Sequence, residues 1–267
     1  MEKAKAAVPA QKSRGGAFQG NIKTAKKAAR AKARLLLKGL SAAEREAQSQ
    51  KAAALFLNSS IYKSAECVAA FFSLADEVDA FPIIARAFID KKRVLLPRIV
   101  AGSNAMDFYE LAAPLGFASD FSAAPVLGVE SVSESAAPEK QSVIPAPRRG
   151  NLLAAPVLGL QNLASALGLQ TEANAWGIRE PLSTLPLVFK DKIPARTAIL
   201  VPGLAFCKDG RRLGRGKGFY DRYLSELLAA NPAFAARGKI CGYCMAVQVA
   251  DTVPTEENDV RVQALFC

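Results

Sequence analysis

Histidine is absent from the whole chain of 267 residues. This absence excludes Ser-His-Asp and Cys-His nucleophile systems, and it excludes zinc sites built on His ligands. The groups that remain for chemistry are carboxylates, Lys, Arg, backbone amides and a metal ion held through oxygen atoms. Enzymes use these groups for phosphoryl transfer, so the composition favours that class of chemistry.

Long apolar runs are missing as well. No segment approaches the roughly 18 unbroken apolar residues that cross a bilayer, and the first residues lack the apolar stretch of a secretory signal. The five cysteines are odd in number and scattered, which is not typical of a disulfide framework. Cys241 and Cys244 lie in an apolar run, which indicates buried strand cysteines rather than a redox pair. We therefore expect a cytoplasmic protein without a membrane partner, and we expect it to be a monomer.

Acidic residues are scarce only near the N-terminus. The formal net charge is +11, and residues 1–51 hold 13 of the Lys and Arg but three of the acidic residues, so they account for +10 of it. The rest of the chain is nearly neutral. The basic segment is typical of a solvated arm, and contact with nucleic acid or anionic lipid is the alternative.

Two segments differ in composition from an ordinary folded domain. Residues 1–21 lack apolar periodicity, which predicts a disordered basic tail. Residues 112–172 are rich in Ala, Ser and Pro and repeat the phrase Ala-Ala-Pro, followed by Leu-Gly or Val-Leu-Gly. We expect a mobile low-complexity insertion there. A tolerated surface insertion is the favoured interpretation, and a docking segment for a partner is the alternative.

The remaining chain alternates between strand and helix patterns. Residues 22–57 predict two helices joined near 39–41, where Ser41 and Glu44 have the spacing of a capping box. Alternation of this kind predicts a single α/β domain over 22–267, with three layers and a mostly parallel central sheet flanked by helices. We expect strands at 66–73, 93–96 (ended by Pro97), 106–111, 197–201, within 239–249 and at 261–266, and helices at 79–90 and 219–230.

The strongest local signal is the run Arg211–Asp221, RRLGRGKGFYD, between a predicted strand and a predicted helix. Its glycines let the backbone approach a ligand, and its amides can form an anion-binding nest at the helix start. Asp221 in the first turn is placed to hold magnesium against phosphates. The spacing fits neither a Walker A loop nor a dinucleotide fingerprint, and a flexible surface turn would contain similar glycines. We predict a polyphosphate site formed by Arg212, Gly214, Arg215, Gly216, Lys217 and Gly218.

A longer stretch around this loop resembles a known signature. Val201–Leu224, VPGLAFCKDGRRLGRGKGFYDRYL, is very similar to the signature of 5-formyltetrahydrofolate cyclo-ligases, also called 5,10-methenyltetrahydrofolate synthetases. Phe219 stands where the family has the first of two tyrosines, which removes a hydroxyl and keeps the ring. Further blocks that resemble the family occur along the chain in the expected order: Lys26 with Arg30, Ser73–Asp79, Leu96–Arg98, Asn174–Pro181 and Glu257–Val262.

The resemblance implies ATP and Mg²⁺ as cofactors and 5-formyltetrahydrofolate as substrate. It implies that ATP phosphorylates the formyl oxygen and that N10 then closes the methenyl ring, releasing ADP and phosphate. The implied catalytic residues are Arg215, Lys217 and Tyr220, and Lys26 and Arg30 join the loop around ATP. The implied folate contacts are Glu77, Trp176 and Tyr220, and the implied magnesium ligands are Asp221 and Asp259.

Other interpretations stay open at this point. The basic N-terminus and Arg14-Gly15-Gly16 would suit a nucleic-acid-binding protein, although the nearly neutral remainder makes nucleic acid the less favoured partner. An ATP-dependent phosphotransferase acting on another small molecule is a second alternative. Without the resemblance, Lys26 and Arg30 would be interpreted as part of a solvated helix face. Trp176 would be interpreted equally well as a core residue or as a ligand contact.

Overall fold

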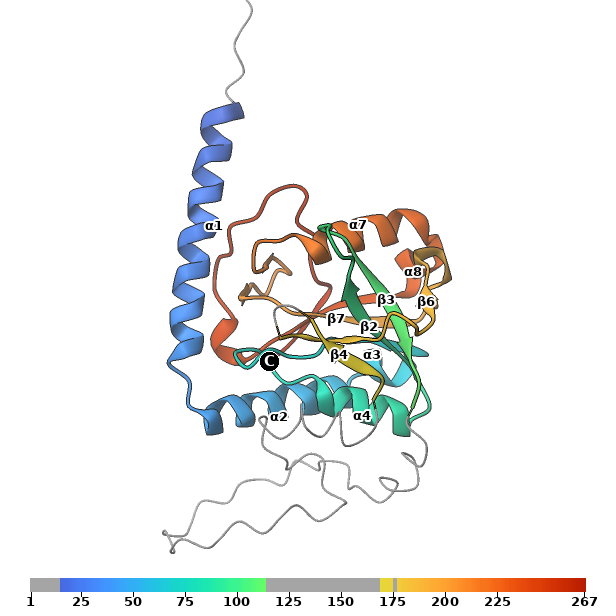
Figure 1. Ribbon diagram of the computed structural model, residues 1–267. Helices are drawn as coiled ribbons and strands as arrows, with labels where there is room; N and C mark the ends of the chain where they lie inside the picture. Colours follow the sequence, from blue (N-terminus) through green and yellow to red (C-terminus); the bar gives the residue numbers. More distant parts are fainter. Residues whose placement is uncertain (1–14, 114–168, 175–176) are drawn as a thin grey trace, which may run out of the picture.

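A seven-stranded sheet forms the centre of the molecule (Figure 1). The computed structural model describes residues 15–113, 169–174 and 177–267. The strand order is β11-β10-β7-β1-β2-β3-β6, and β4-β5 and β8-β9 form two small separate sheets. The strands are β1 (Cys67–Ala69), β2 (Arg93–Ile99), β3 (Met106–Leu111), β4 (Thr171–Ala173), β5 (Arg179–Pro181), β6 (Leu187–Val188), β7 (Thr197–Val201), β8 (Ala205–Phe206), β9 (Arg212–Leu213), β10 (Lys239–Tyr243) and β11 (Ala264–Phe266).

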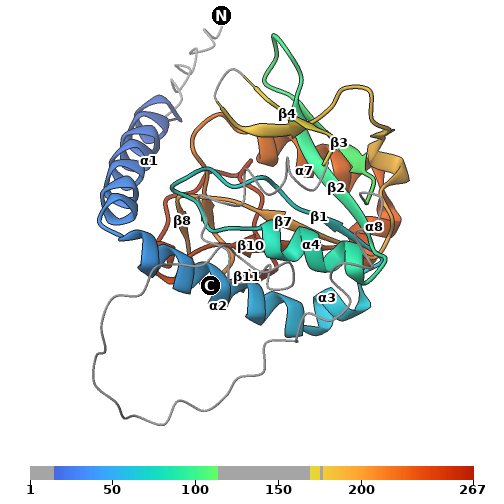
Figure 2. The same cartoon turned by 60° about the horizontal axis from the view of Figure 1, so that its bottom comes forward.

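Helices cover both faces of this sheet, with α2 and α4 on one side and α7 and α8 on the other (Figures 1 and 2). The pairs β11/β10, β10/β7, β7/β1 and β1/β2 are parallel, and β3 and β6 are antiparallel additions at one edge. The prediction of a three-layer α/β fold with a mostly parallel sheet is confirmed. The helices are α1 (Gly15–Lys38), α2 (Ala42–Asn58), α3 (Ser60–Ser64), α4 (Phe81–Ile89), α7 (Phe219–Ala230) and α8 (Pro232–Arg237), with short 3-10 turns η2 (Lys190–Lys192) and η3 (Ala246–Gln248).

The core has two halves because successive strand residues point to opposite faces of the sheet. Val68 of β1 packs with α1, α2 and α4 on one face, whereas Cys67 and Ala69 pack with α7 and α8 on the other. The central strands are buried on both faces, as expected for parallel strands between helical layers. This explains why they appear in the sequence as continuous apolar runs.

The N-terminal helices follow the predicted pattern with one difference. Ser41 caps α2, and its hydroxyl and the Glu44 carboxylate form the predicted capping box. Helix α1 begins at Gly15, so residues 15–21 are helical and were wrongly placed in the tail; extending an existing helix costs little compared with nucleating one. Residues 1–14 of the predicted tail lie outside the described residues. No helix in the described part of the chain is long and apolar enough to cross a membrane.

Several predicted boundaries were wrong. The strand predicted at 66–73 is only Cys67–Ala69, the strand predicted at 261–266 is only Ala264–Phe266, and the helix predicted at 79–90 is Phe81–Ile89.

Strand β2 continues through Pro97, which pairs with Phe108 of β3. The pairing of β1 with β2 ends at Ala69 and Leu95, so the other side of Pro97 has no partner strand, and an edge position tolerates proline. Order also resumes earlier than predicted, because Thr171–Ala173 pairs with Arg179–Pro181 inside the expected insertion. Residues 114–168 of that insertion lie outside the described residues.

Candidate active site

A cavity of about 670 Å³ opens where the parallel strands end at their carboxyl sides. Ligands of open α/β sheets bind at this edge because the loops leaving the strands converge there. Phe71 and Phe72 enter the cavity after β1, and Pro202 and Gly203 enter it after β7. Every predicted site residue in the described part of the chain lines this cavity: Lys26, Arg30, Glu77, Arg212, Gly214, Arg215, Gly216, Lys217, Gly218, Tyr220, Asp221 and Asp259. Trp176 lies outside the described residues.

The glycine loop joins β9 to α7. Gly216 and Gly218 have φ angles of 108° and 71°, in the left-handed region that favours glycine. Gly218 is the N-cap of α7, and no side chain caps that helix. Backbone N–H groups at an uncapped helix start suit an anion, and the helix dipole adds a positive end there. The loop therefore has the geometry of the predicted anion nest.

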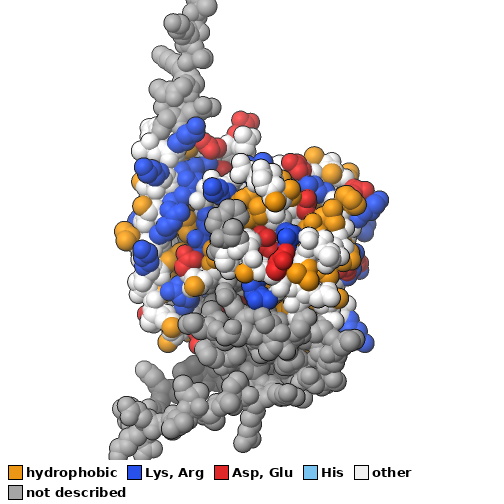
Figure 3. Space-filling view, viewed as in Figure 1, with side chains coloured by type: hydrophobic (Ala, Val, Ile, Leu, Met, Phe, Trp, Pro, Cys, Tyr) orange, Lys and Arg blue, Asp and Glu red, His pale blue; other side chains and the backbone are white. Residues whose placement is uncertain are grey.

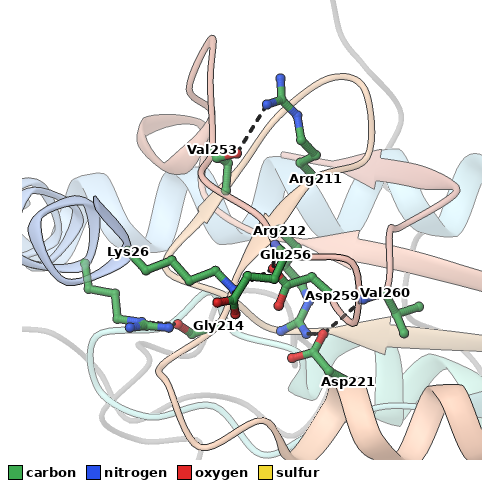
Figure 4. A network of polar contacts seen from close by, with 10 residues as sticks. Lys26, Arg211, Arg212, Gly214, Asp221, Val253, Glu256, Asp259 and Val260 are labelled. Atoms are coloured by element: carbon green, nitrogen blue, oxygen red, sulfur yellow. Dashed lines mark hydrogen bonds and ion pairs between the residues drawn. The ribbon is translucent and has the colours of Figure 1, made fainter. Parts of the chain in front are cut away.

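Helix α1 supplies three cations to the same cavity, Lys23, Lys26 and Arg30, and the last two bond the protein there. Lys26 Nζ forms ion pairs with Asp259 Oδ2 at 2.6 Å and Glu256 Oε2 at 2.8 Å (Figure 4). Burial lowers the pKa of Lys26, but its bonds to Asp259 and Glu256 outweigh that effect and the net pKa is raised, so the amine is charged. Arg30 Nε donates to Gly214 O at 3.0 Å and so ties α1 to the glycine loop.

Four other cations of α1, Lys27, Lys32, Arg34 and Lys38, are exposed and do not line the cavity. The helix contains no acidic residue, and Lys and Arg side chains gather along it on the face shown in Figure 3. Lys27, Lys32 and Arg34 are exposed, whereas Lys26 is only 6% exposed. The cations of α1 thus divide into a set that lines the cavity and a set exposed to solvent.

Asp221 is held in place by two donors. Arg212 Nη2 donates to Asp221 Oδ1 at 2.6 Å, and Val260 N donates to the same oxygen at 3.2 Å. The Arg212 side chain is 3% exposed, and its Nη1 also donates to Pro202 O. Arg212 therefore orients Asp221 at the cavity wall through its Nη atoms, and its buried Nε has no hydrogen-bond partner among the described residues.

The two predicted metal ligands meet the requirements of magnesium in part. Val260 N bonds Asp221, so the residue after Asp259 links the two aspartates, and the two residues share one cavity. Within the described residues, Asp221 Oδ2 and Asp259 Oδ1 receive no hydrogen bond. Magnesium binds through one or two carboxylates together with phosphate oxygens and water. The donor set fits that pattern, and no group of three or more acidic or Cys side chains in the described part could hold a metal alone.

Arg215 points across the cavity to an acidic pair. Its Nε donates to Glu77 Oε1 at 2.9 Å and its Nη2 donates to Asp76 Oδ1 at 2.6 Å. Burial raises the pKa of the Glu77 carboxyl, and the charge of Arg215 opposes that rise. Lys217, two positions along the loop, is exposed at the cavity. In this structure Lys217 is therefore more accessible to a ligand than Arg215.

Tyr220 brings an unpaired hydroxyl into this region. The hydroxyl is buried and has no hydrogen-bond partner among the described residues. Burial, and then the negative charge of Glu77, raise its pKa well above the ordinary value for tyrosine. A buried hydroxyl without a partner is costly, so a polar ligand atom beside Glu77 would remove that cost.

The small β4-β5 sheet forms a further wall that the sequence did not predict. Glu180 is 5% exposed, and its Oε1 accepts hydrogen bonds from Ile99 N at 3.1 Å and from Asn174 Nδ2 at 2.9 Å. These bonds fix the β4-β5 sheet against the end of β2. Asp76 and Glu256 were also missed as site residues. Asp76 directly precedes Glu77 and Glu256 lies three positions before Asp259, and this closeness in sequence was the available signal.

Comparisons with known proteins identify the family to which this chain is similar. Residues 22–129 and 128–267 match the model of the 5-formyltetrahydrofolate cyclo-ligase family. A 5-formyltetrahydrofolate cyclo-ligase of Mus musculus is 27% identical over 251 residues, covering 92% of this chain and 94% of that protein. A shorter match of 68 residues, 37% identical, covers 26% of this chain and 32% of a probable 5-formyltetrahydrofolate cyclo-ligase of Caenorhabditis elegans. A relative from Arabidopsis thaliana is described as mitochondrial.

Solved structures show the same fold. The NMR structure of Aquifex aeolicus 5,10-methenyltetrahydrofolate synthetase superposes with a TM-score of 0.55 at 23% identity, covering 90% of this chain and 88% of that one. The structure of a 5,10-methenyltetrahydrofolate synthetase from Mycoplasma pneumoniae gives a TM-score of 0.51 at 16% identity, covering 90% and 97%.

Proposed function

This chain belongs to the 5-formyltetrahydrofolate cyclo-ligase family, and we propose that it uses ATP and magnesium to convert 5-formyltetrahydrofolate to 5,10-methenyltetrahydrofolate. The family assigns it to the ligases. The observation that carries the finer proposal is the meeting of three features in one cavity: an uncapped glycine loop, cations from α1, and the aspartates Asp221 and Asp259. This arrangement suits a nucleotide triphosphate with a magnesium ion.

The nucleotide occupies the side of the cavity between α1 and the glycine loop. Loop amides, Lys217 and Arg215 face its phosphates, and Lys26 and Arg30 reach it from α1. Asp221 and Asp259 hold magnesium, which neutralises part of the charge on the phosphates. This proposal is supported by the oxygens of the two aspartates that receive no hydrogen bond within the described residues.

The folate occupies the more apolar side of the cavity. Phe71, Leu74, Ile99 and Met106 line that side and suit a flat ring. The buried carboxylate of Glu77 accepts N–H groups of the pterin edge, and the unpaired Tyr220 hydroxyl lies in its field. A few polar groups within an apolar pocket are the usual means of orienting such a ligand.

The reaction needs no histidine. The formamide carbon of the substrate is a poor electrophile, and transfer of the γ-phosphoryl group to the formyl oxygen turns that oxygen into a leaving group. N10 then attacks the formyl carbon, the carbon–oxygen bond breaks with release of phosphate, and N10 loses its proton. Because N10 belongs to the same molecule, proximity supplies much of the acceleration. The protein supplies preorganised positive charge for the phosphates during transfer.

A direct assay tests this function. The purified protein is incubated with 5-formyltetrahydrofolate, ATP and magnesium, and methenyl absorbance in the near ultraviolet is followed. Turnover is expected only when all three are present. Turnover that proceeds without ATP, or no turnover with all three present, would overturn the proposal.

A further inference from the structure

Arg215 connects the two halves of the cavity. It belongs to the glycine loop, yet its guanidinium bonds Glu77 and Asp76 in the loop after β1, at 2.9 and 2.6 Å. The sequence separation between Arg215 and Glu77 is 138 positions, so only the fold brings them together. An arginine of the loop predicted to bind phosphates is therefore bound to the carboxylate predicted to contact the pterin.

Glu77 depends on this contact. Its side chain is 9% exposed, and its carboxylate accepts from Arg215 Nε and, through Oε2, from Leu74 N. Phe71, Leu74 and Met106 are among the apolar residues of the same cavity. A buried carboxylate in such surroundings needs N–H donors, because burial without them is costly. Whatever displaces Arg215 from Glu77 has to supply donors of its own.

The pterin ring supplies donors of the same kind. Its N3–H and 2-amino group lie side by side on one edge and present two roughly parallel N–H bonds, as a guanidinium does. Glu77 accepts one N–H of the Arg215 guanidinium, whose second donor bonds Asp76, and the same carboxylate is suited to accept N–H groups of the pterin edge. Arg215 and the pterin are thus alternative partners for Glu77, and they cannot bond the same oxygen lone pairs at once.

We propose that Arg215 is a coupling residue: nucleotide phosphates draw it away from Glu77, which opens the Glu77 carboxylate to the pterin. The two substrates then bind with positive cooperativity. This inference rests on the proposed function and adds a relation between its two binding sites. A ligand shifts such an equilibrium only by its differential affinity for the two states, and the phosphates bind the released arginine alone.

Asp76, the second carboxylate that Arg215 bonds, makes it possible for the pterin to replace Arg215 at Glu77. The Asp76 side chain is 42% exposed, so water solvates it once Arg215 departs, whereas Glu77 stays buried and keeps only the bond from Leu74 N until the pterin arrives. The Tyr220 hydroxyl, which has no hydrogen-bond partner among the described residues and lies in the field of Glu77, adds a second polar group that a ligand can satisfy. By linkage, the folate strengthens nucleotide binding by the same factor.

Calorimetry with 5-formyltetrahydrofolate, with and without magnesium and a non-hydrolysable ATP analogue, tests the inference. In the wild-type protein the analogue is expected to raise folate affinity about tenfold, within the usual range of coupling between sites. In Arg215→Ala, folate is expected to bind without the analogue as tightly as it binds wild type with it, and the analogue should add nothing. The inference would be overturned if the analogue left the folate affinity of the wild type unchanged. It would also be overturned if Arg215→Ala bound folate more weakly than the wild type does without the analogue.

A second variant keeps the test valid if Arg215→Ala does not fold. Asp76→Asn removes one counter-ion from Arg215, so the analogue is expected to bind several-fold more tightly than to wild type. Asp191→Asn removes the same charge from an exposed turn away from the cavity and should leave the affinity unchanged. Equal affinities of Asp76→Asn and Asp191→Asn for the analogue would contradict the inference.

The methenyl assay separates this inference from the proposed function. Turnover together with folate binding that ignores the nucleotide analogue would refute the coupling alone. Absence of both folate binding and turnover would refute the function on which the coupling rests.

Discussion

Lys26 Nζ and Asp259 Oδ2 lie 2.6 Å apart although 233 positions separate the two residues in the chain. This ion pair joins α1 to the loop before β11, and the bond from Arg30 to Gly214 joins the same helix to the glycine loop. The candidate site is therefore assembled from both ends of the chain around the carboxyl edge of the sheet. Loss of either contact is expected to affect the nucleotide side of the cavity first.

Lys26→Gln is expected to lower kcat/KM for ATP about 100-fold, because a preorganised positive group facing the phosphates is removed. Lys27→Gln, on the exposed side of the same helix, is the matched control and should retain nearly full activity. Initial rates over a range of ATP concentrations measure both variants, and thermal unfolding reports any loss of stability. Similar losses in the two variants would show that Lys26 has no special place at the nucleotide.

Asp221→Asn is expected to reduce turnover to background while the protein stays folded. The Asn oxygen can still accept from Arg212 and Val260, so the local structure is kept and the charge for magnesium is lost. Glu226→Gln in the same helix removes an exposed carboxylate paired with Lys190 and serves as the control. Rates measured over a magnesium titration, with a melting curve for each variant, check the result. Full activity in Asp221→Asn would remove the metal assignment.

Asp79 gives the protein a pH-dependent stability. Burial raises its pKa to about 6, the hydrogen bond from Phe81 N opposes the rise, and the charge of Glu46 adds to it. The Asp79 carboxyl takes up a proton more readily in the folded form than in the unfolded form. Its contribution to the free energy of unfolding is therefore present at low pH and is lost as the pH rises through about 6.

Asp79→Asn removes this dependence. The free energy of unfolding of wild type minus that of the variant is expected to increase by about 2 kcal/mol when the pH falls from about 7 to about 4. Urea unfolding at both pH values measures the difference. Parallel behaviour of wild type and variant across this range would show that Asp79 titrates normally in the folded protein.

Deletion of residues 118–150 is expected to leave turnover nearly unchanged. The segment holds the repeated Ala-Ala-Pro pattern and none of the predicted site residues. Methenyl formation by the shortened protein, compared with the full chain at equal concentration, is the measurement. A large loss of kcat would show that the insertion contributes to the active site.

The sequence predicted regular elements well where local chemistry determines them. The bounds of β3, β7 and α7 match the predictions, because each is a continuous apolar or periodic run flanked by glycine, proline or polar residues. The passage of β2 through Pro97 could not be predicted, because it depends on which side of the strand lacks a partner. The cytoplasmic location and the monomeric state stay predictions.

The residues of the candidate site could be predicted from the sequence, but the ion pairs and hydrogen bonds between them could not. The family signature brought together the glycine loop, Lys26 and Asp259, and the fold places them in one cavity. The charges of Arg212 and Arg215 were assigned to phosphates, whereas the structure pairs Arg212 with Asp221 and Arg215 with an acidic pair. Such pairings arise from long-range packing, on which local pattern carries no information.

The central claim is that one cavity binds ATP beside 5-formyltetrahydrofolate and transfers the γ-phosphoryl group to the formyl oxygen. The most direct measurement uses substrate carrying a heavy oxygen isotope in the formyl group and follows the released phosphate by mass spectrometry. The label is expected in phosphate in amounts equal to the methenyl product formed. Unlabelled phosphate, or methenyl product formed without ADP, would contradict the account.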